Sequence, residues 1–188
     1  MERALAEDLG TGDVTSAAVL PADLTLSTVV EAREPLVACG LPLAQAVFHA
    51  VDPSLATHLA VSEGTHVQAG QVLLEVRGSA RSVLAAERTV LNVLGRMCGV
   101  ASFTRRYLEA VAGTGVAIVD TRKTLPGFRS LDKYAVAVGG GTNHRAGLYD
   151  AILIKDNHVA AAGGVGAAVK AARANAAPHL QVQVEVES

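Results

Sequence analysis

The sequence has few aromatic residues and no tryptophan, since aromatic side chains make up 3% of its 188 residues. It also lacks any apolar run near the ~18 residues that a membrane-spanning helix needs, so no membrane protein is expected. Half of the residues are nevertheless apolar, which predicts a buried core and argues against a disordered chain. Its two cysteines, Cys39 and Cys98, form no CxxC pattern. We interpret them as buried, reduced thiols of a cytoplasmic protein.

The chain also lacks a strong net charge. Its formal value is −2 at pH 7, which argues against a general nucleic-acid-binding protein. Lys and Arg outnumber Asp and Glu between Arg81 and Lys155, whereas the rest of the chain is acidic. A basic middle in an acidic chain predicts a local anion site rather than a basic surface. Residues 1–13 are acidic and polar, so no signal peptide is expected.

The first 80 residues have the pattern of a small α+β unit with an antiparallel sheet. The strands that we expect cover residues 24–30, 35–39, 56–62 and 71–77. Short helices are predicted over residues 2–9, before Gly10, and over residues 41–51, before Asp52-Pro53. A long helix is predicted from residue 82 to about residue 111.

This long helix has two distinct faces. Apolar side chains at helical spacing predict a buried stripe of Val83, Val90, Leu94, Met97, Ala101 and Leu108. A second face is small and polar and consists of Arg88, Asn92, Gly95, Arg96, Gly99 and Ser102. The small residues on this second face would let another surface approach closely.

Beyond Gly113, short apolar strands alternate with helices, a pattern typical of parallel βα units. Strands are predicted over residues 116–121, 151–154 and 181–187, and helices over residues 131–138 and 165–176. We therefore expect an α/β chain. An N-terminal α+β sandwich domain would cover residues 1–112, and a partial, truncated βα barrel residues 113–188. Three strands cannot close a barrel, which needs about 250 residues, so we expect a fragment or a missing part supplied elsewhere.

Charged residues follow the ends of the predicted parallel strands, where the active sites of βα barrels lie. Four cations and two carboxylates stand there: Arg122, Lys123, Arg145, Lys155, Glu185 and Glu187. Together they suit a substrate with several negative charges, with a metal ion or sugar hydroxyls for the carboxylates. Ordinary solvated charges are the alternative, although adjacent like charges repel and need an anionic partner. His144, beside Arg145, would more commonly be a structural, hydrogen-bonding histidine.

Three segments carry a family resemblance. TRKTLPGFRSLDKYAVAVGGGTNHRAGLYDAILIKDNH, residues 121–158, closely resembles the central signature of the quinolinate phosphoribosyltransferases. EDLGTGDVTS near the start and AAERTVLNVLGRMCGVAS in the predicted long helix are similar to two further segments of that family. The resemblance extends over the chain from Glu7 onward.

The resemblance implies a decarboxylating phosphoribosyltransferase of NAD biosynthesis. It would join quinolinate to the ribose of phosphoribosyl pyrophosphate (PRPP), giving nicotinate mononucleotide, pyrophosphate and CO₂, with Mg²⁺ as cofactor. The resemblance places substrate contacts at Thr121, Arg122, Lys123, His144, Arg145 and Lys155. It implies catalytic positions at Lys123, Lys155 and Glu187.

Two further positions follow from the same resemblance. Glu187 would meet the PRPP ribose and Mg²⁺, and Glu185 is the alternative because both residues have the same parity along the strand. Arg88 would enter the site of the neighbouring subunit, which implies a homodimer.

Two other functions remain open. A nicotinate-type phosphoribosyltransferase of the same superfamily would need fewer cations, but counting cations does not settle the choice. A nucleotide-cofactor oxidoreductase is suggested by Gly164 and Gly166 at a helix start, with Glu185 ~20 residues further on. Against it, the third small position is Val169, and the glycines lie several residues beyond the preceding strand.

Overall fold

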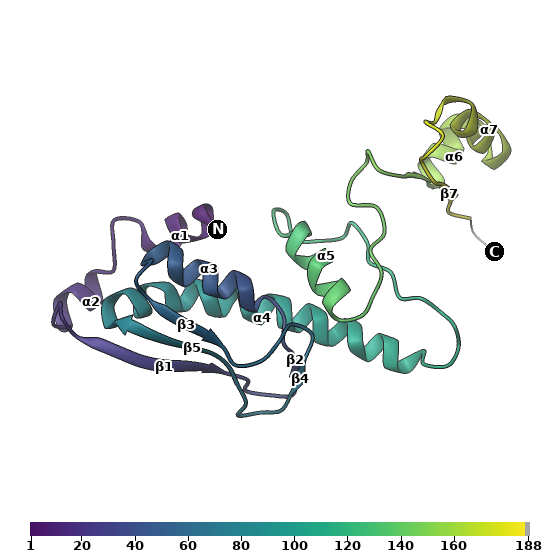
Figure 1. The fold of residues 1–188 in the computed structure, drawn as a ribbon. Helices are drawn as coiled ribbons and strands as arrows, with labels where there is room; N and C mark the ends of the chain where they lie inside the picture. The colour runs from purple at the N-terminus through teal and green to yellow at the C-terminus, as the bar shows by residue number, and fades with distance from the viewer. Residues whose placement is uncertain (187–188) are drawn as a thin grey trace. The chain divides into compact units, whose positions relative to one another are not determined.

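A computed structural model of the chain describes residues 1–186 (Figure 1). The chain folds as two units. Unit 1 consists of Met1–Asp120 and Ser130–Thr142, and unit 2 consists of Thr121–Arg129 and the chain from Asn143 onward. The predicted boundary after residue 112 divides the chain differently, because residues 130–142 belong with the N-terminal part.

Unit 1 contains the expected antiparallel sheet, which has three strands in the order β1-β5-β3. They are β1 (Thr25–Glu31), β3 (Ala56–Leu59) and β5 (Val72–Ser79), and β5 pairs antiparallel with both neighbours. A second antiparallel pair joins β2 (Leu36–Val37) and β4 (His66–Val67). The short strand β4 was not predicted, because two residues are too few to show a periodic pattern.

The helices of unit 1 are α1 (Glu2–Leu9), α2 (Val14–Val19), α3 (Leu41–Val51), α4 (Ala80–Ala110) and α5 (Arg129–Val138). All but α2 agree closely with the prediction. The helix α2 was not predicted because its six residues are too few to show an apolar stripe. Its start depends on Asp13, whose carboxylate accepts hydrogen bonds from the backbone N–H groups of Thr15 and Ser16, both at 3.0 Å.

The core of unit 1 lies between its sheet and the helices α3 and α4, which run along one face of that sheet (Figure 1). The predicted stripe of α4 is confirmed, since Val83, Val90, Leu94, Met97 and Ala101 are buried and Leu108 is partly buried. Phe48 of α3 and Leu74 of β5 are fully buried in the same core. Burying each large apolar side chain contributes roughly 1.5–3 kcal/mol, so this core gives unit 1 its stability.

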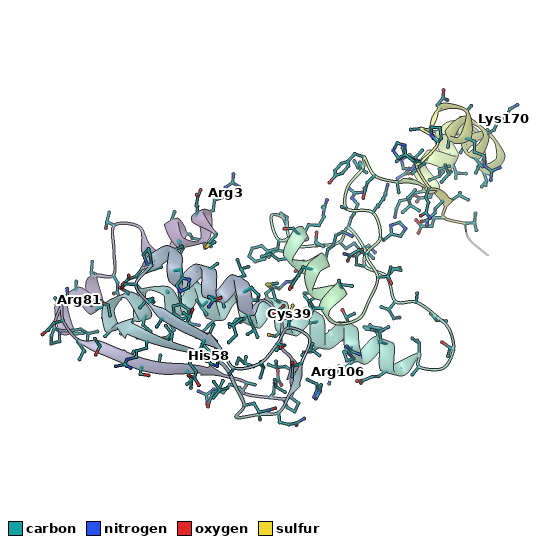
Figure 2. The ribbon with its side chains drawn as sticks, in the orientation of Figure 1. Arg3, Cys39, His58, Arg81, Arg106 and Lys170 are labelled. Atoms are coloured by element: carbon teal, nitrogen blue, oxygen red, sulfur yellow. The ribbon has the colours of Figure 1, made fainter. Side chains whose placement is uncertain are left out.

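The two cysteines meet between the start of α3 and the middle of α4, and both are buried free thiols, as predicted. Cys39, labelled in Figure 2, donates its backbone N–H to Sγ of Cys98 at 3.3 Å. The Cys98 thiol in turn donates to the Cys39 carbonyl oxygen at 3.3 Å. Burial, helped by the nearby charge of Glu63, raises the pKa of the Cys39 thiol to about 12. These thiols therefore serve as packed hydrogen-bonding groups.

The next residue, Gly40, must be glycine for two reasons. Its φ of +89° lies in the left-handed region, and a Cβ there would come within 2.6 Å of the Met97 sulfur. The Glu63 carboxylate accepts the backbone N–H groups of Gly40 at 3.0 Å and Leu41 at 2.7 Å. Glu63 thus caps α3 from a distant loop.

Unit 2 contains one parallel pair, β6 (Ile152–Ile154) and β7 (Val182–Val184), together with α6 (Asp156–Ala162) and α7 (Val165–Asn175). The parallel pairing and the connecting helix α7 agree with the prediction of βα units. The helix α6 was not predicted. Position 187 of the predicted third strand lies outside the described residues. The chain is therefore a mixed α/β protein, and within residues 1–186 no closed barrel is present.

The predicted buried strand over residues 116–121 is wrong. Within it, Val119 alone forms a bridge, parallel to Thr142. Val116 and Val119 are 58% and 50% exposed. The apolar pattern suited a central strand, but a central strand needs ladders on both edges and cover on both faces, which this segment lacks in the described structure.

None of the helices within residues 1–186 is long and apolar enough to cross a membrane.

Candidate anion-binding site

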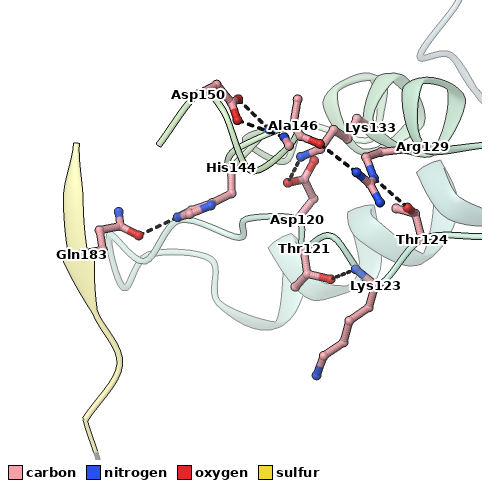
Figure 3. Close-up of polar contacts among 11 residues, drawn as sticks. Asp120, Thr121, Lys123, Thr124, Arg129, Lys133, His144, Ala146, Asp150 and Gln183 are labelled. Carbon is pink, nitrogen blue, oxygen red and sulfur yellow. Dashed lines mark hydrogen bonds and ion pairs between the residues drawn. The ribbon is translucent and has the colours of Figure 1, made fainter. Parts of the chain in front are cut away.

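Most of the predicted site residues lie in unit 2, on two loops and at the ends of two strands. We call residues 121–129 the first loop and residues 143–150 the second loop. Thr121, Arg122 and Lys123 lie on the first loop, His144 and Arg145 on the second, Lys155 follows β6 and Glu185 follows β7. Arg88 lies on α4 in unit 1 and is exposed, and Glu187 lies outside the described residues. The two loops are drawn in close-up in Figure 3.

The first loop begins with a tight local turn. The Thr121 hydroxyl oxygen accepts the backbone N–H of Lys123 at 3.0 Å, while the Lys123 side chain is directed away from these contacts (Figure 3). Between them, Nε of Arg122 is buried and has no hydrogen-bond partner among the described residues. Leaving a buried donor unsatisfied costs about 1–3 kcal/mol. An anionic acceptor that formed a hydrogen bond with this donor would remove that cost, which would favour its binding.

Arg129 connects the two loops. Its Nε donates to the Thr124 hydroxyl at 3.1 Å, and its Nη1 donates to the carbonyl oxygen of Ala146 at 3.1 Å (Figure 3). The planar guanidinium has donors in a fixed geometry, which suits it to this bridge. Arg129 therefore links the segment with Arg122 and Lys123 to the segment with His144 and Arg145.

The second loop is closed by Asp150. Its carboxylate accepts the backbone N–H groups of Ala146 at 2.6 Å and Gly147 at 2.9 Å. A Cβ on Gly147 would lie 2.2 Å from the ring of the exposed Tyr149, so that side chain would have to move to admit a larger residue. Arg145 donates from Nη1 to the Ala151 carbonyl oxygen at 3.3 Å, a long contact that leaves the other guanidinium donors to be used elsewhere.

One face of β7 contacts two of the predicted site residues. Gln183 Oε1 lies 2.6 Å from Nε2 of His144, and Glu185 Oε2 lies 3.1 Å from Nζ of Lys155. Gln183 and Glu185 have the same parity and therefore point to the same side of the strand. The backbone N–H of Lys155 donates to Nδ1 of His158 at 3.0 Å, which holds the start of α6.

The chain enters the first loop from a buried ion pair in unit 1. Nζ of Lys133, on α5, lies 2.6 Å from Oδ1 of Asp120, and the side chains are 8% and 6% exposed. Asp120 also donates its backbone N–H to the Thr142 carbonyl oxygen at 3.1 Å. Asp120 directly precedes Thr121, so this pair fixes the residue from which the first loop starts.

Helix α5 is itself held to α4 by a second ion pair. Arg96 makes a bidentate contact with Asp132 at 2.9 and 2.8 Å, and its hydrogen bonds to this carboxylate raise the pKa of Arg96. Tyr134 donates its hydroxyl to Glu63 at 3.0 Å. After α5, Gly139 passes α4 so closely that a Cβ would lie 2.5 Å from the Ala101 carbonyl oxygen. The glycine run before the second loop is therefore a packing requirement.

Sequence reasoning missed the residues that hold the site together. Arg129, Asp150 and Lys133 stand within the long signature but were not singled out, and Gln183 was passed over. One signal was available for Gln183, because it shares the strand face of Glu185. The structure brings Lys155 together with Glu185 and links the two loops, whereas the meeting of all four cations around one substrate stays a prediction.

Within residues 1–186 no group of three or more His, Cys, Asp or Glu is arranged to hold a metal ion. Magnesium is often bound through one or two carboxylates together with substrate phosphates. Glu185 is the carboxylate among the described predicted site residues that we consider for this role, and its Oε2 lies 3.1 Å from Nζ of Lys155.

Comparison with known proteins gives concordant matches along the chain. The family model described as "Quinolinate phosphoribosyl transferase, N-terminal domain" matches residues 13–98, and the one described as "Quinolinate phosphoribosyl transferase, C-terminal domain" matches residues 100–188. A nicotinate-nucleotide pyrophosphorylase [carboxylating] of Mycobacterium leprae is 49% identical over all of this chain and 67% of its own length. A mitochondrial quinolinate phosphoribosyltransferase [decarboxylating] of Nicotiana tabacum is 44% identical over all of this chain and 54% of its own.

A solved structure agrees with these matches. NadC from Streptococcus pyogenes superposes with a TM-score of 0.95 at 41% identity, covering all of this chain and 66% of that one. The chain thus spans between about half and two thirds of the length of the proteins that it matches.

Proposed function

Because the chain belongs to the quinolinate phosphoribosyltransferase family, we propose that the full-length protein transfers the phosphoribosyl group of PRPP to quinolinate. The products would be nicotinate mononucleotide, pyrophosphate and CO₂, in NAD biosynthesis. The observation that supports this most directly is the pair of linked loops that carry Arg122, Lys123, His144 and Arg145. Within these loops, the buried Nε of Arg122 has no hydrogen-bond partner among residues 1–186.

Quinolinate is a pyridine with two adjacent carboxylates, so its binding requires several donors and positive charges in a fixed arrangement. Guanidinium groups suit carboxylates because they can form two parallel hydrogen bonds. Arg122 and Arg145 are the residues we assign to this task, with Lys123 and Lys155 as point charges and the Thr121 hydroxyl and His144 as hydrogen-bonding neighbours. The Arg129 bridge would keep the two loops at the spacing that the ring requires.

Between the two carboxylates considered for the ribose, we favour Glu185. Its contact with Lys155 places a carboxylate beside a predicted catalytic lysine. Glu187 has the same parity and remains the alternative assignment. Glu185 and the phosphates of PRPP would together hold Mg²⁺, which would supply charge neutralisation to the departing pyrophosphate.

The mechanism needs no covalent nucleophile. As pyrophosphate leaves, the ribose carbon develops oxocarbenium character and the pyridine nitrogen forms the new bond to it. The bond between C2 of the pyridinium ring and its carboxylate then breaks, CO₂ leaves, and the electron pair that stays on C2 takes up a proton from solvent. Lys123 and Lys155 would stabilise the negative charge that develops on C2. Positioning and electrostatic stabilisation supply the rate enhancement, and one preorganised contact of this kind is worth about 3 kcal/mol.

We also propose that the active form is a homodimer in which Arg88 enters the partner's site. Arg88 is exposed and shares a face of α4 with Gly95 and Gly99. A Cβ added to either glycine would meet no atom within 4 Å among the described residues, so this face leaves room for a close approach. Mixing Arg88→Ala subunits with Lys155→Ala subunits of the full-length enzyme should restore part of the activity. Verified heterodimers that stay inactive would contradict a shared site.

The deciding experiment measures PRPP-dependent release of CO₂ from carboxyl-labelled quinolinate by the full-length protein, beside turnover of nicotinate. We expect release from quinolinate and little turnover of nicotinate; the reverse would favour the nicotinate-type enzyme.

Arg145→Ala should weaken quinolinate binding at least about tenfold, since it removes a charged hydrogen-bond donor. Arg173→Ala, on the exposed surface of α7, is the matched control. Unchanged binding by Arg145→Ala would refute this pocket.

A further inference from the structure

A hydrogen bond joins Gln183 on β7 to His144 on the second loop. We infer that Gln183 is a positioning residue for His144, and that it fixes the orientation and tautomer of the imidazole beside the substrate. The expected effect on quinolinate kinetics rests on the proposed function. The orientation of the ring is inferred from one contact, in which Oε1 of Gln183 lies 2.6 Å from Nε2 of His144 (Figure 3).

The chemistry of the two groups determines which proton is involved. An amide oxygen can only accept a hydrogen bond, so the imidazole must donate from Nε2. A neutral ring held in this way carries its proton on Nε2. Removing the acceptor would withdraw a contact that favours the Nε2–H form and would shift the balance between the two tautomers.

The backbone of β7 determines where the amide lies. Gln183 is paired with Leu153 in the parallel ladder, between the pairs Val182–Ile152 and Val184–Ile154. Its neighbours Val182 and Val184 are partly buried on the opposite side of the strand. The position of Gln183 is therefore set by the sheet, whereas His144 stands on the second loop and contacts the Gln183 amide from there.

The choice of an amide, in place of a carboxylate, also suits the proposed substrate. A carboxylate at this position would accept the same hydrogen bond but would add a negative charge next to a site for a dianion. Glutamine orients the ring without that repulsion. On the same strand face, Glu185 contacts the cation of Lys155, which offsets its charge.

The test separates ring orientation from charge. Imidazole nitrogen NMR of the full-length protein reports the tautomer of His144, and initial-rate kinetics report KM and kcat for quinolinate. In the wild type we expect one dominant Nε2–H tautomer. Gln183→Ala and Gln183→Met should both lower the share of the Nε2–H tautomer and raise the quinolinate KM about three- to tenfold, with a smaller change in kcat, because one hydrogen bond is lost.

Two further variants complete the design. Gln183→Glu should keep the Nε2–H tautomer, because it retains an acceptor, yet raise KM through repulsion of the dianion. Gln181→Ala, two residues earlier on the same face, should change neither property. An unchanged tautomer in folded Gln183→Ala or Gln183→Met would overturn the inference. A protein inactive towards quinolinate would refute the proposed function, while the NMR measurement would still decide the role of Gln183.

Discussion

The two units hold their charged side chains in different surroundings. In unit 1, Lys133 and Asp120 form an ion pair whose side chains are 8% and 6% exposed. In unit 2, Lys155 and Glu185 form one whose side chains are 44% and 62% exposed. Unit 1 also buries more apolar side chains than unit 2. Both hydrophobic clusters belong to unit 1, whereas the buried apolar side chains of unit 2 within residues 1–186 are Ile154 and Ala168.

This difference indicates how each unit keeps its geometry. Unit 1 is stabilised by burial, so a polar group removed from its interior leaves a costly unpaired partner. Unit 2 carries most of the predicted substrate-binding residues. Hydrogen bonds that Arg129 donates and that Asp150 and Gln183 accept hold its loops in place. Single changes should therefore affect global stability in unit 1 and local order in unit 2.

The largest effect is expected for Lys133→Met, which removes the ammonium group that lies 2.6 Å from the buried Asp120 carboxylate. Removing one partner of a buried pair costs about 3–5 kcal/mol, and urea denaturation would measure the loss. The double variant Asp120→Leu with Lys133→Met should recover most of it, because no charge then remains buried. A loss below about 1 kcal/mol in Lys133→Met would show that this pair behaves like a surface pair and would remove the contrast between the units.

In unit 2, Arg129→Met should loosen the loops and leave the global unfolding free energy almost unchanged. The hydrogen bond from Arg129 to Ala146, which joins the two loops, is lost together with the one to Thr124 within the first loop. Amide exchange in residues 143–150 should therefore accelerate about tenfold, as expected for a local opening made easier by about 1.4 kcal/mol. Exchange mass spectrometry would measure this, with Arg173→Met as the control. Equal acceleration in both variants would contradict the role of the bridge.

A smaller effect is expected for Tyr134→Phe, which removes the hydrogen bond to Glu63. The loss should be about 1 kcal/mol at neutral pH. Burial, followed by the hydrogen bond to Glu63, raises the pKa of Tyr134 to about 12. An unfolded chain releases a tyrosine proton near pH 10, so the Tyr134 contribution is complete below pH ~10 and is lost as the pH rises towards 12.

The unfolding free energy of the wild type should therefore fall towards that of Tyr134→Phe across this alkaline range. Parallel curves for the two proteins would show that the hydroxyl is not held as described.

The last prediction concerns the reactivity of the two thiols and involves no substitution. Because burial raises the pKa of Cys39 to about 12 and also raises that of Cys98, neither should react with iodoacetamide at pH 8 in the native protein. Both should react once the chain is unfolded in urea, which mass spectrometry would count. Labelling of the native protein at the unfolded rate would show that the core of unit 1 opens far more readily than its packing indicates.

Much of the fold could be predicted from local patterns. The apolar stripe of α4 spans many turns, so its periodicity identified both the helix and its buried side. The strand over residues 116–121 was mispredicted for the opposite reason. Its apolar residues are compatible with a central strand, but whether a strand forms depends on neighbours that a short segment does not specify. The helix α2 depends on one capping side chain, Asp13, and leaves no periodic signal.

For the site, the cations themselves could be predicted, but the residues whose hydrogen bonds hold the site together could not. Arg122, Lys123, Arg145 and Lys155 were identified because they stand in a long signature and follow strand ends. Arg129 looked like one more charged residue in that run, and Gln183 like an ordinary polar residue on a strand. Their contacts join residues 17 and 39 positions apart in sequence, as the bonds to Ala146 and His144 show.

The sequence by itself determined the family, through its long signature segments. It also determined the antiparallel arrangement of the first part of the chain and the kinds of residues that would meet an anionic substrate, because these depend on local patterns. The tertiary structure alone decided that α5 belongs with unit 1, that Lys133 is buried against Asp120, and that Gln183 faces His144. Such pairings depend on which distant segments come within hydrogen-bonding distance. That distance is set by the packing of the whole unit and by no single stretch of residues.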